Sequence, residues 1–145
     1  ETALEELLTE QALFVMERVN RQTPPIDRLF AQICAVHAFH HGREARIVFL
    51  SQAIAASGER VKEIIDVGNR VFEAQRRATV ELLEAGMANG SVVPCDAEAL
   101  VNVIRALTDG LVAQRVMTDL DLAPVHEFLW THLLSPLKKT RKKKR

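Results

Sequence analysis

The densest group of chemically reactive side chains is the run CAVHAFHH, which contains Cys34, His37, His40 and His41. Thiolate and imidazole groups are preferred ligands of zinc and of several other transition metals. On a helix, Cys34, His37 and His41 would lie within one arc. One helix cannot surround a tetrahedral ion, so a metal site would need a further ligand from another element. The sequence does not identify that ligand.

Packing explains the same run without a metal. A cysteine packs as a small hydrophobic residue, and buried histidines hydrogen-bond to carbonyl groups or to water. No CxxC or HExxH pattern accompanies the run. We therefore expect no metal and no cofactor. A metal-responsive sensor with Cys34, His37 and His41 as ligands is kept as an alternative.

Catalysis finds little support in the sequence. A Cys34 nucleophile with His37 as its base has a suitable spacing, but no loop supplies donors for a developing oxyanion. The sequence also has no Gly-rich loop that would bind phosphate. We expect that the protein is not an enzyme and that it has no catalytic residues.

Apolar residues recur at intervals of three and four along most of the chain, which predicts helices. No alternating stretch of useful length predicts a strand. Local signals mark the boundaries, among them Thr23-Pro24-Pro25, Gly42, Ser57-Gly58 and Asn89-Gly90. We expect an all-α fold of about six helices, over residues 2–20, 25–41, 44–56, 59–87, 96–117 and, after a cap at Asp119 or Asp121, up to 134.

A chain of 145 residues suits one domain. Seven of the 19 basic residues lie in 138–145, so residues 1–137 hold 12 basic against 19 acidic residues, a net charge of −7. We expect 1–137 to form one acidic domain that disfavours direct contact with DNA, and 138–145 to be a disordered basic tail. No stretch is apolar enough for a bilayer span or a signal peptide, and two cysteines make no disulfide framework. These features predict a cytoplasmic protein without a membrane partner.

The last two predicted helices carry more apolar surface than one core needs. In the first of them, small residues at Ala99, Ala106, Gly110 and Ala113 would let another helix approach closely. In the second, Trp130, Leu134 and Leu137 fall outside the stripe of Leu122, Val125, Phe128, Leu129 and Leu133. Large exposed apolar patches are rare on monomers, so we expect a second subunit there. The alternative is a helical interaction module that binds a different protein and has no effector.

Several polar or small residues interrupt the apolar stripes of the earlier helices: Gln11, His37, His40, Gly68, Gln75 and Thr79. A ligand cavity is mostly apolar, with a few convergent polar groups, and such residues on facing helices would build one. A local hydrogen bond or a close helix contact explains each residue equally well by itself. The residues alone leave both interpretations open.

Three runs give the chain a family resemblance. AGMANGSV at 85–92, DAEAL at 96–100 and ALTDGL at 106–111 resemble the closing half of the ligand-binding domain of TetR-type transcriptional regulators. The resemblance implies a homodimer closed by a four-helix bundle of the last two helices, and a small, largely apolar effector between the first four. Members of the family bind operator DNA through an N-terminal helix-turn-helix, which has no counterpart between Glu1 and the first predicted helix. We therefore expect DNA binding only through a domain outside this chain.

With that resemblance, the interrupted stripes favour a ligand cavity. The expected ligand-binding residues are Gln11, Phe14, Phe30, His37, His40, Gly68, Phe72, Gln75 and Thr79, in which the aromatic residues serve as walls. The expected dimer interface consists of Ala106, Gly110, Ala113, Met117, Phe128, Trp130 and Leu134. Effector binding would favour one spacing of the helices that carry the DNA-reading domains.

Overall fold

The computed structural model describes residues 2–139, and this part of the chain has six α-helices and no strand. The helices are α1 (Thr2–Arg18), α2 (Pro25–His40), α3 (Glu44–Ala55), α4 (Val61–Ala88), α5 (Ala97–Thr118) and α6 (Leu122–Phe128). A 3₁₀ turn at Gly58–Arg60 precedes α4. After α6 the chain continues as a π-helix, Leu129–Leu134, and a 3₁₀ turn, Ser135–Leu137. The predicted all-α fold is confirmed.

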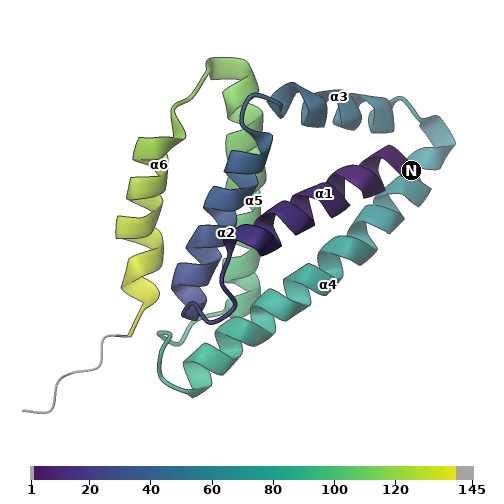
Figure 1. The fold of residues 1–145 in the computed structure, drawn as a ribbon. Helices are drawn as coiled ribbons and strands as arrows, with labels where there is room; N and C mark the ends of the chain where they lie inside the picture. Colours follow the sequence, from purple (N-terminus) through teal and green to yellow (C-terminus); the bar gives the residue numbers. More distant parts are fainter. Residues whose placement is uncertain (1, 140–145) are drawn as a thin grey trace, which may run out of the picture.

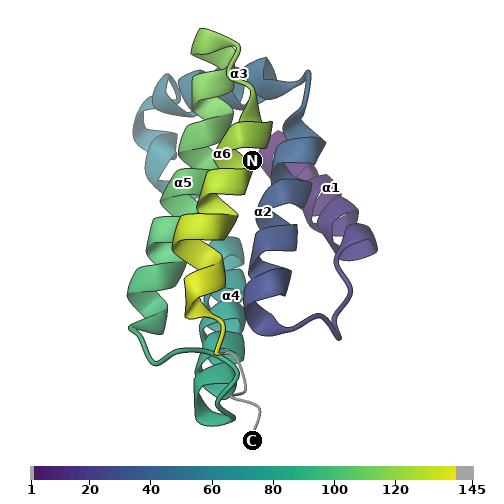
Figure 2. The same ribbon diagram turned by 90° about the vertical axis from the view of Figure 1, so that its left-hand side faces the viewer.

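The helices surround a core at one end of the molecule and diverge at the other. Figure 1 shows α2 and α5 near the centre, α6 on one side, and α1 and the long α4 on the other, with α3 across one end. α1 packs against α2, and α4 packs against α5 and α2. Figure 2, turned by 90°, shows α6 in front of α2 and α5.

The boundaries of the α4–α5 hairpin follow from local chemistry. Gly90 has a φ of 80°, a conformation that side-chain-bearing residues rarely adopt, and it ends the turn after α4. The side chain of Asp96 accepts a hydrogen bond from the backbone N–H of Ala99 at 3.0 Å, which caps α5. Before the turn, a Cβ at Gly86 would lie 2.6 Å from Cγ2 of Val92. Only glycine permits this close return of the chain.

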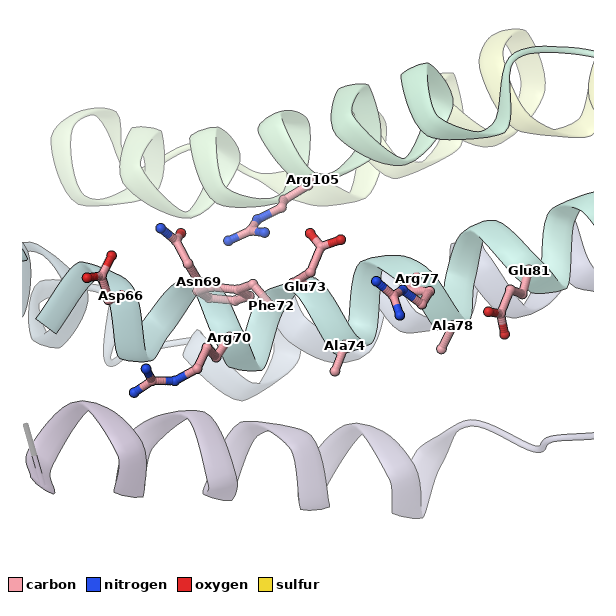
Figure 3. A pocket seen from close by; sticks show the side chains of 10 residues that line it. All are labelled: Asp66, Asn69, Arg70, Phe72, Glu73, Ala74, Arg77, Ala78, Glu81 and Arg105. Carbon is pink, nitrogen blue, oxygen red and sulfur yellow. The ribbon is translucent and has the colours of Figure 1, made fainter. Parts of the chain in front are cut away.

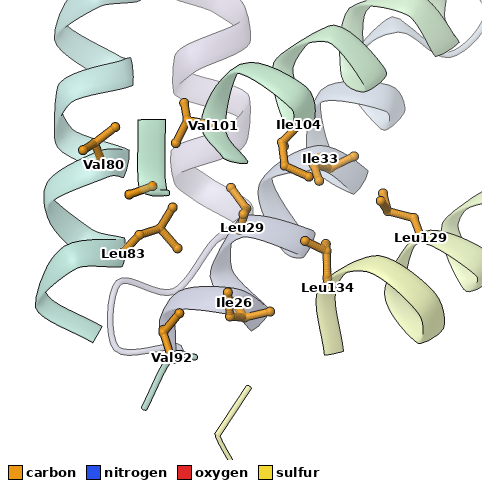
Figure 4. Packing of buried hydrophobic residues seen from close by; sticks show 11 residues of the cluster. Ile26, Leu29, Ile33, Val80, Leu83, Val92, Val101, Ile104, Leu129 and Leu134 are labelled. Atoms are coloured by element: carbon orange, nitrogen blue, oxygen red, sulfur yellow. The ribbon is translucent and has the colours of Figure 1, made fainter. Parts of the chain in front are cut away.

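The core lies where α2, the end of α4, the start of α5 and the C-terminal π-helix meet (Figure 4). Its buried side chains are Ile26, Leu29, Ile33, Val80, Leu83, Val92, Ala97, Val101, Ile104, Leu129 and Leu134. By contrast, every side chain of α3 is at least partly exposed, and Phe49 is 70% exposed. The largest cluster of buried side chains therefore lies away from α3.

The π-helix corrects one sequence prediction. Leu134 is 0% exposed and lies in the core, whereas Leu133 is 47% exposed. α-Helical spacing in the sequence predicts Leu133 inside and Leu134 in the dimer interface. In a π-helix the backbone N–H of each residue donates a hydrogen bond to the carbonyl five residues earlier. Leu134 therefore lies about one turn after the buried Leu129. Leu134 is enclosed by the core of the single chain, so it is removed from the predicted interface.

The end of the described chain is tied to the helices. Lys138 forms an ion pair with Asp27 at 2.8 Å, and the backbone N–H of Lys139 donates to the carbonyl of Ser91 at 3.1 Å. These two residues belong to the predicted basic tail. The rest of that tail, 140–145, lies outside the described residues.

Candidate functional site

A cavity of about 620 Å³ lies between α1, α2, α4 and α5. Its size falls within the usual range for small-molecule sites, roughly 300–1,000 Å³. The apolar part of the lining consists of Ala12, Val15, Met16, Leu29, Ile33, Val36, Phe72, Ala78, Leu82, Val101 and Ile104. The polar part consists of Gln11, Arg28, Gln32, Gln75, Arg76, Thr79, Glu81, Arg105, Thr108 and Asp109.

The cavity exists because α1 packs against α2 and leaves space between itself and α4. α1 packs mainly against α2, and it meets α4 near Gly68, where a Cβ would lie 4.0 Å from a methyl group of Leu4. Further along, the side of α4 that faces α1 carries the short or polar residues Gln75, Ala78 and Thr79. Large apolar side chains at these positions would fill the space.

Gln11 is held in place at the cavity by His40. Nε2 of His40 donates a hydrogen bond to Oε1 of Gln11 at 2.7 Å, joining α2 to α1. Burial, together with the nearby His37, lowers the pKa of His40 to about 4, so the imidazole is neutral at neutral pH. With its oxygen already occupied, the Gln11 amide retains its N–H donors for a guest molecule.

The structure brings part of the predicted ligand set together. Gln11, Phe72, Gln75 and Thr79 line the cavity. His40 reaches it through Gln11, and Gly68 lies at the contact with α1. The Thr79 hydroxyl donates to the carbonyl of Gln75 at 2.9 Å, so it offers a guest only its acceptor lone pairs.

The predicted aromatic walls Phe14 and Phe30 lie elsewhere. Phe14 packs edge-on against Phe39, with ring centroids 5.4 Å apart. Phe30 packs against Trp130, with centroids 5.1 Å apart, on the side of the molecule that carries α6. Neither side chain is in the cavity lining, because both serve helix packing around α2.

His37 also points away from the cavity, toward α5 and α6. The side chain is 1% exposed. Its Nε2 donates to the carbonyl oxygen of Thr108 at 2.9 Å, and its Nδ1 lies 2.7 Å from Nε2 of His126. Burial lowers the pKa of both His37 and His126. His37 therefore joins three helices and does not contact a guest.

His126 was not among the residues predicted from the sequence. The residue lies four positions after the buried Leu122 and three before the buried Leu129. That helical spacing would have placed it on the inner face of α6.

The predicted metal ligands do not converge. Cys34 is half-buried, and burial raises the pKa of its thiol, which favours the protonated form. The exposed His41 contacts Arg115 through Nδ1. Between residues 2 and 139, no group of three or more His, Cys, Asp or Glu side chains is arranged to hold a metal ion. Both ring nitrogens of His37 already have partners.

A second, larger hollow of about 860 Å³ runs along the outer face of α4 (Figure 3). Charged side chains of both signs line it, including Asp66, Arg70, Glu73 and Arg77, with Arg105 reaching over from α5. Its lining comes almost entirely from one helix. Such a surface suits solvent better than it suits an apolar guest.

The predicted interface residues of α5 share one exposed face. Ala106, Gly110, Ala113 and Met117 are all exposed, and Met117 is 78% exposed; Val103, which was not among the predicted interface residues, is 54% exposed on the same face. Their spacing alternates between three and four residues, as in the contact seam of paired helices. Apart from its chain neighbours and the backbone of its own helix, no described atom lies within 4 Å of a Cβ built at Gly110. Phe128 is exposed on α6, and Trp130 is half-buried against Phe30.

Comparisons with family models, with curated proteins and with solved structures find no match. In the part of the chain that the structure describes, none of the helices combines the length and hydropathy of a bilayer span.

Proposed function

We propose that this chain is the effector-binding and dimerisation domain of a TetR-like transcriptional regulator. A small, largely apolar molecule binds between α1, α2, α4 and α5, and two copies pair through α5 and α6. The observation that carries the proposal is the cavity of about 620 Å³, whose lining combines apolar residues from four helices with polar ones. The runs AGMANGSV and ALTDGL support the family assignment through their resemblance alone.

Pairing through α5 is supported by the chemistry of its exposed face. Val103 and Met117 would be buried by a second helix, while Ala106, Gly110 and Ala113 would let that helix approach closely. Phe128 extends the apolar surface onto α6. Contiguous apolar patches of this kind mark interaction sites more often than free surface.

Effector binding would act through the spacing of α1 and α4, because both helices line the cavity. A guest that fits one spacing better than another shifts the population toward it. In a dimer this shift changes the separation of two DNA-reading domains attached outside this chain, and so their fit to the operator. The coupling free energy equals the difference between the guest's affinities for the two spacings.

A cavity-filling variant tests the proposal. Ala12→Phe places a ring in the cavity, and Ala53→Phe adds the same ring on the exposed side of α3 as the matched control. A panel of small apolar molecules should raise the melting temperature of the parent and of Ala53→Phe, but not of Ala12→Phe. The proposal is wrong if no molecule stabilises the parent, or if Ala12→Phe responds as the parent does.

A second function, binding to a different protein without any effector, is favoured by α3. This helix exposes Phe49 and has no fully buried side chain of its own. Sedimentation separates the two proposals. A symmetric dimer at micromolar concentration supports the regulator domain, and a monomer supports the interaction module.

A further inference from the structure

Arg28, on the first turn of α2, is among the residues that line the cavity, and its side chain also holds an unsatisfied donor. Its Nε atom is buried and has no hydrogen-bond acceptor among residues 2–139. The only hydrogen bond of this side chain in the same part of the chain is a long one, 3.4 Å from Nη1 to the carbonyl of Arg21. Buried donors in folded proteins normally have partners, so an orphaned one indicates a missing acceptor.

The other arginines of the lining are already occupied. Arg76 makes a two-point contact with Glu73, at 2.8 and 2.7 Å. Arg105 lies 3.8 Å from Asp109 and stacks over the ring of Phe72, with 3.7 Å to the centroid. Within residues 2–139, Arg28 has no carboxylate within ion-pair distance. Among the described residues that line the cavity, it is the cation without an acidic partner.

The surroundings of Arg28 suit a molecule with one polar end. Gln32, one turn further along α2, lines the same cavity and can donate to an oxygen. Leu29, Ile33 and Val36 continue the α2 wall away from Arg28 as aliphatic surface. A guest molecule whose polar head group contacts Arg28 would therefore place its tail against these apolar walls.

We propose that the cavity binds a monocarboxylate with an apolar tail and that Arg28 anchors its carboxylate. The Nε–H and one Nη–H of a guanidinium lie side by side and match the two oxygens of a carboxylate. Because Nε is closed to solvent, a modest rotation of the side chain accompanies binding. This inference rests on the proposed function and names the class of effector.

Calorimetric titration with octanoate, 1-octanol and octyl phosphate tests the anchor, because the three probes share a tail and differ in the head. Octanoate should bind the parent chain at least about tenfold more tightly than 1-octanol, since hydrogen bonds to charged groups contribute on that scale. Arg28→Met should abolish this preference while still binding 1-octanol, which shows that the cavity is intact. Arg28→Lys keeps the positive charge but loses the paired Nε–H and Nη–H donors. Its preference for octanoate over 1-octanol should fall between those of the parent and of Arg28→Met. Arg77→Met, on the outer face of α4, is the matched control and should behave as the parent does.

The outcomes distinguish a failure of the Arg28 anchor from a failure of the effector cavity. Equal binding of octanoate and 1-octanol by the parent, or a preference for octanoate that survives in Arg28→Met, would overturn the anchor while leaving the effector cavity in place. Octyl phosphate binding as tightly as octanoate would overturn the carboxylate assignment in favour of a general anion site. Binding of none of the three probes would overturn the anchor. If no other apolar molecule binds either, the proposed function fails as well.

Discussion

Nδ1 of His37 lies 2.7 Å from Nε2 of His126, and the two rings are parallel to within 4°. Because His37 must donate through Nε2 to the Thr108 carbonyl, its Nδ1 is an acceptor, and the His126 Nε2–H is the donor. Burial lowers the pKa of both rings, so both are neutral at neutral pH. This neutral histidine pair joins α6, which carries part of the proposed dimer surface, to α2 and α5.

Removing the donor of this pair should destabilise the fold. His126→Phe keeps an aromatic ring beside Phe30 but leaves Nδ1 of the buried His37 without a partner. The expected loss is about 1–3 kcal/mol in the free energy of unfolding, measured by urea denaturation. His126→Gln restores a donor and should recover part of the loss. An equal loss in the control His132→Phe, on an exposed side chain, would show that the pair contributes nothing specific.

Acid should destabilise the protein through its buried histidines. The folded state lowers the pKa of His37, His40 and His126, so the unfolded chain binds protons more readily. Stability is therefore full above the ordinary histidine pKa of about 6.5 and falls as the pH drops toward the His40 pKa of about 4. Protonation of His40 accounts for roughly 3 kcal/mol of the loss in unfolding free energy over that pH range. Chemical denaturation at a series of pH values measures the loss.

A non-titrating variant provides the check on this pH dependence. His40→Gln can still hydrogen-bond to Gln11 and should show a shallower loss of stability between about pH 6.5 and pH 4. His132→Gln should retain the steep loss. Identical pH profiles for the parent and His40→Gln would contradict the assignment.

Adjacent leucines test the π-helical turn. Leu134→Ala should cost about 2–5 kcal/mol of unfolding free energy, because the core cannot fill the space left behind. Leu133→Ala should cost well under half as much, because that side chain is half exposed. Urea denaturation of both variants gives the comparison. If Leu133→Ala costs more, the helix continues in the α-helical register that the sequence predicted.

Gly110 tests the dimer. Arginine is a better helix former than glycine, and the space around this position is open within the subunit, so Gly110→Arg should not lower the stability of a single subunit. It should nevertheless prevent a second α5 from approaching. Sedimentation should show a dimer for the parent and for the control Ala53→Arg, and a monomer for Gly110→Arg. A dimer that persists in Gly110→Arg would place the contact elsewhere.

The helices could be predicted from the sequence because their ends depend on local chemistry. Asp96 caps α5, Pro25 begins α2 and Gly90 turns the chain after α4, and each signal lies within a few residues of the boundary it sets. The π-helix could not be predicted in this way, since its register is fixed by the packing of Leu129 and Leu134 into a core built from three other helices.

The candidate site was predicted only in part for the same reason. Polar interruptions in apolar stripes identified Gln11, Gln75 and Thr79 as cavity residues. His37 has the same kind of sequence position, but its side chain contacts α5 and α6 instead, at the Thr108 carbonyl and His126. Arg28 was missed because nothing in its local sequence distinguishes it from a solvent-exposed arginine. Its significance comes from a tertiary environment that buries Nε without an acceptor.

The position of a bound molecule shows whether the cavity is an effector site. We would record intermolecular nuclear Overhauser effects between octanoate, or the best apolar molecule from the thermal panel, and the methyl groups of the protein. The account predicts contacts to Val15, Leu82 and Ile104, which come from three helices and line the cavity together. Contacts confined to exposed methyl groups such as those of Val103 and Leu133 would contradict it.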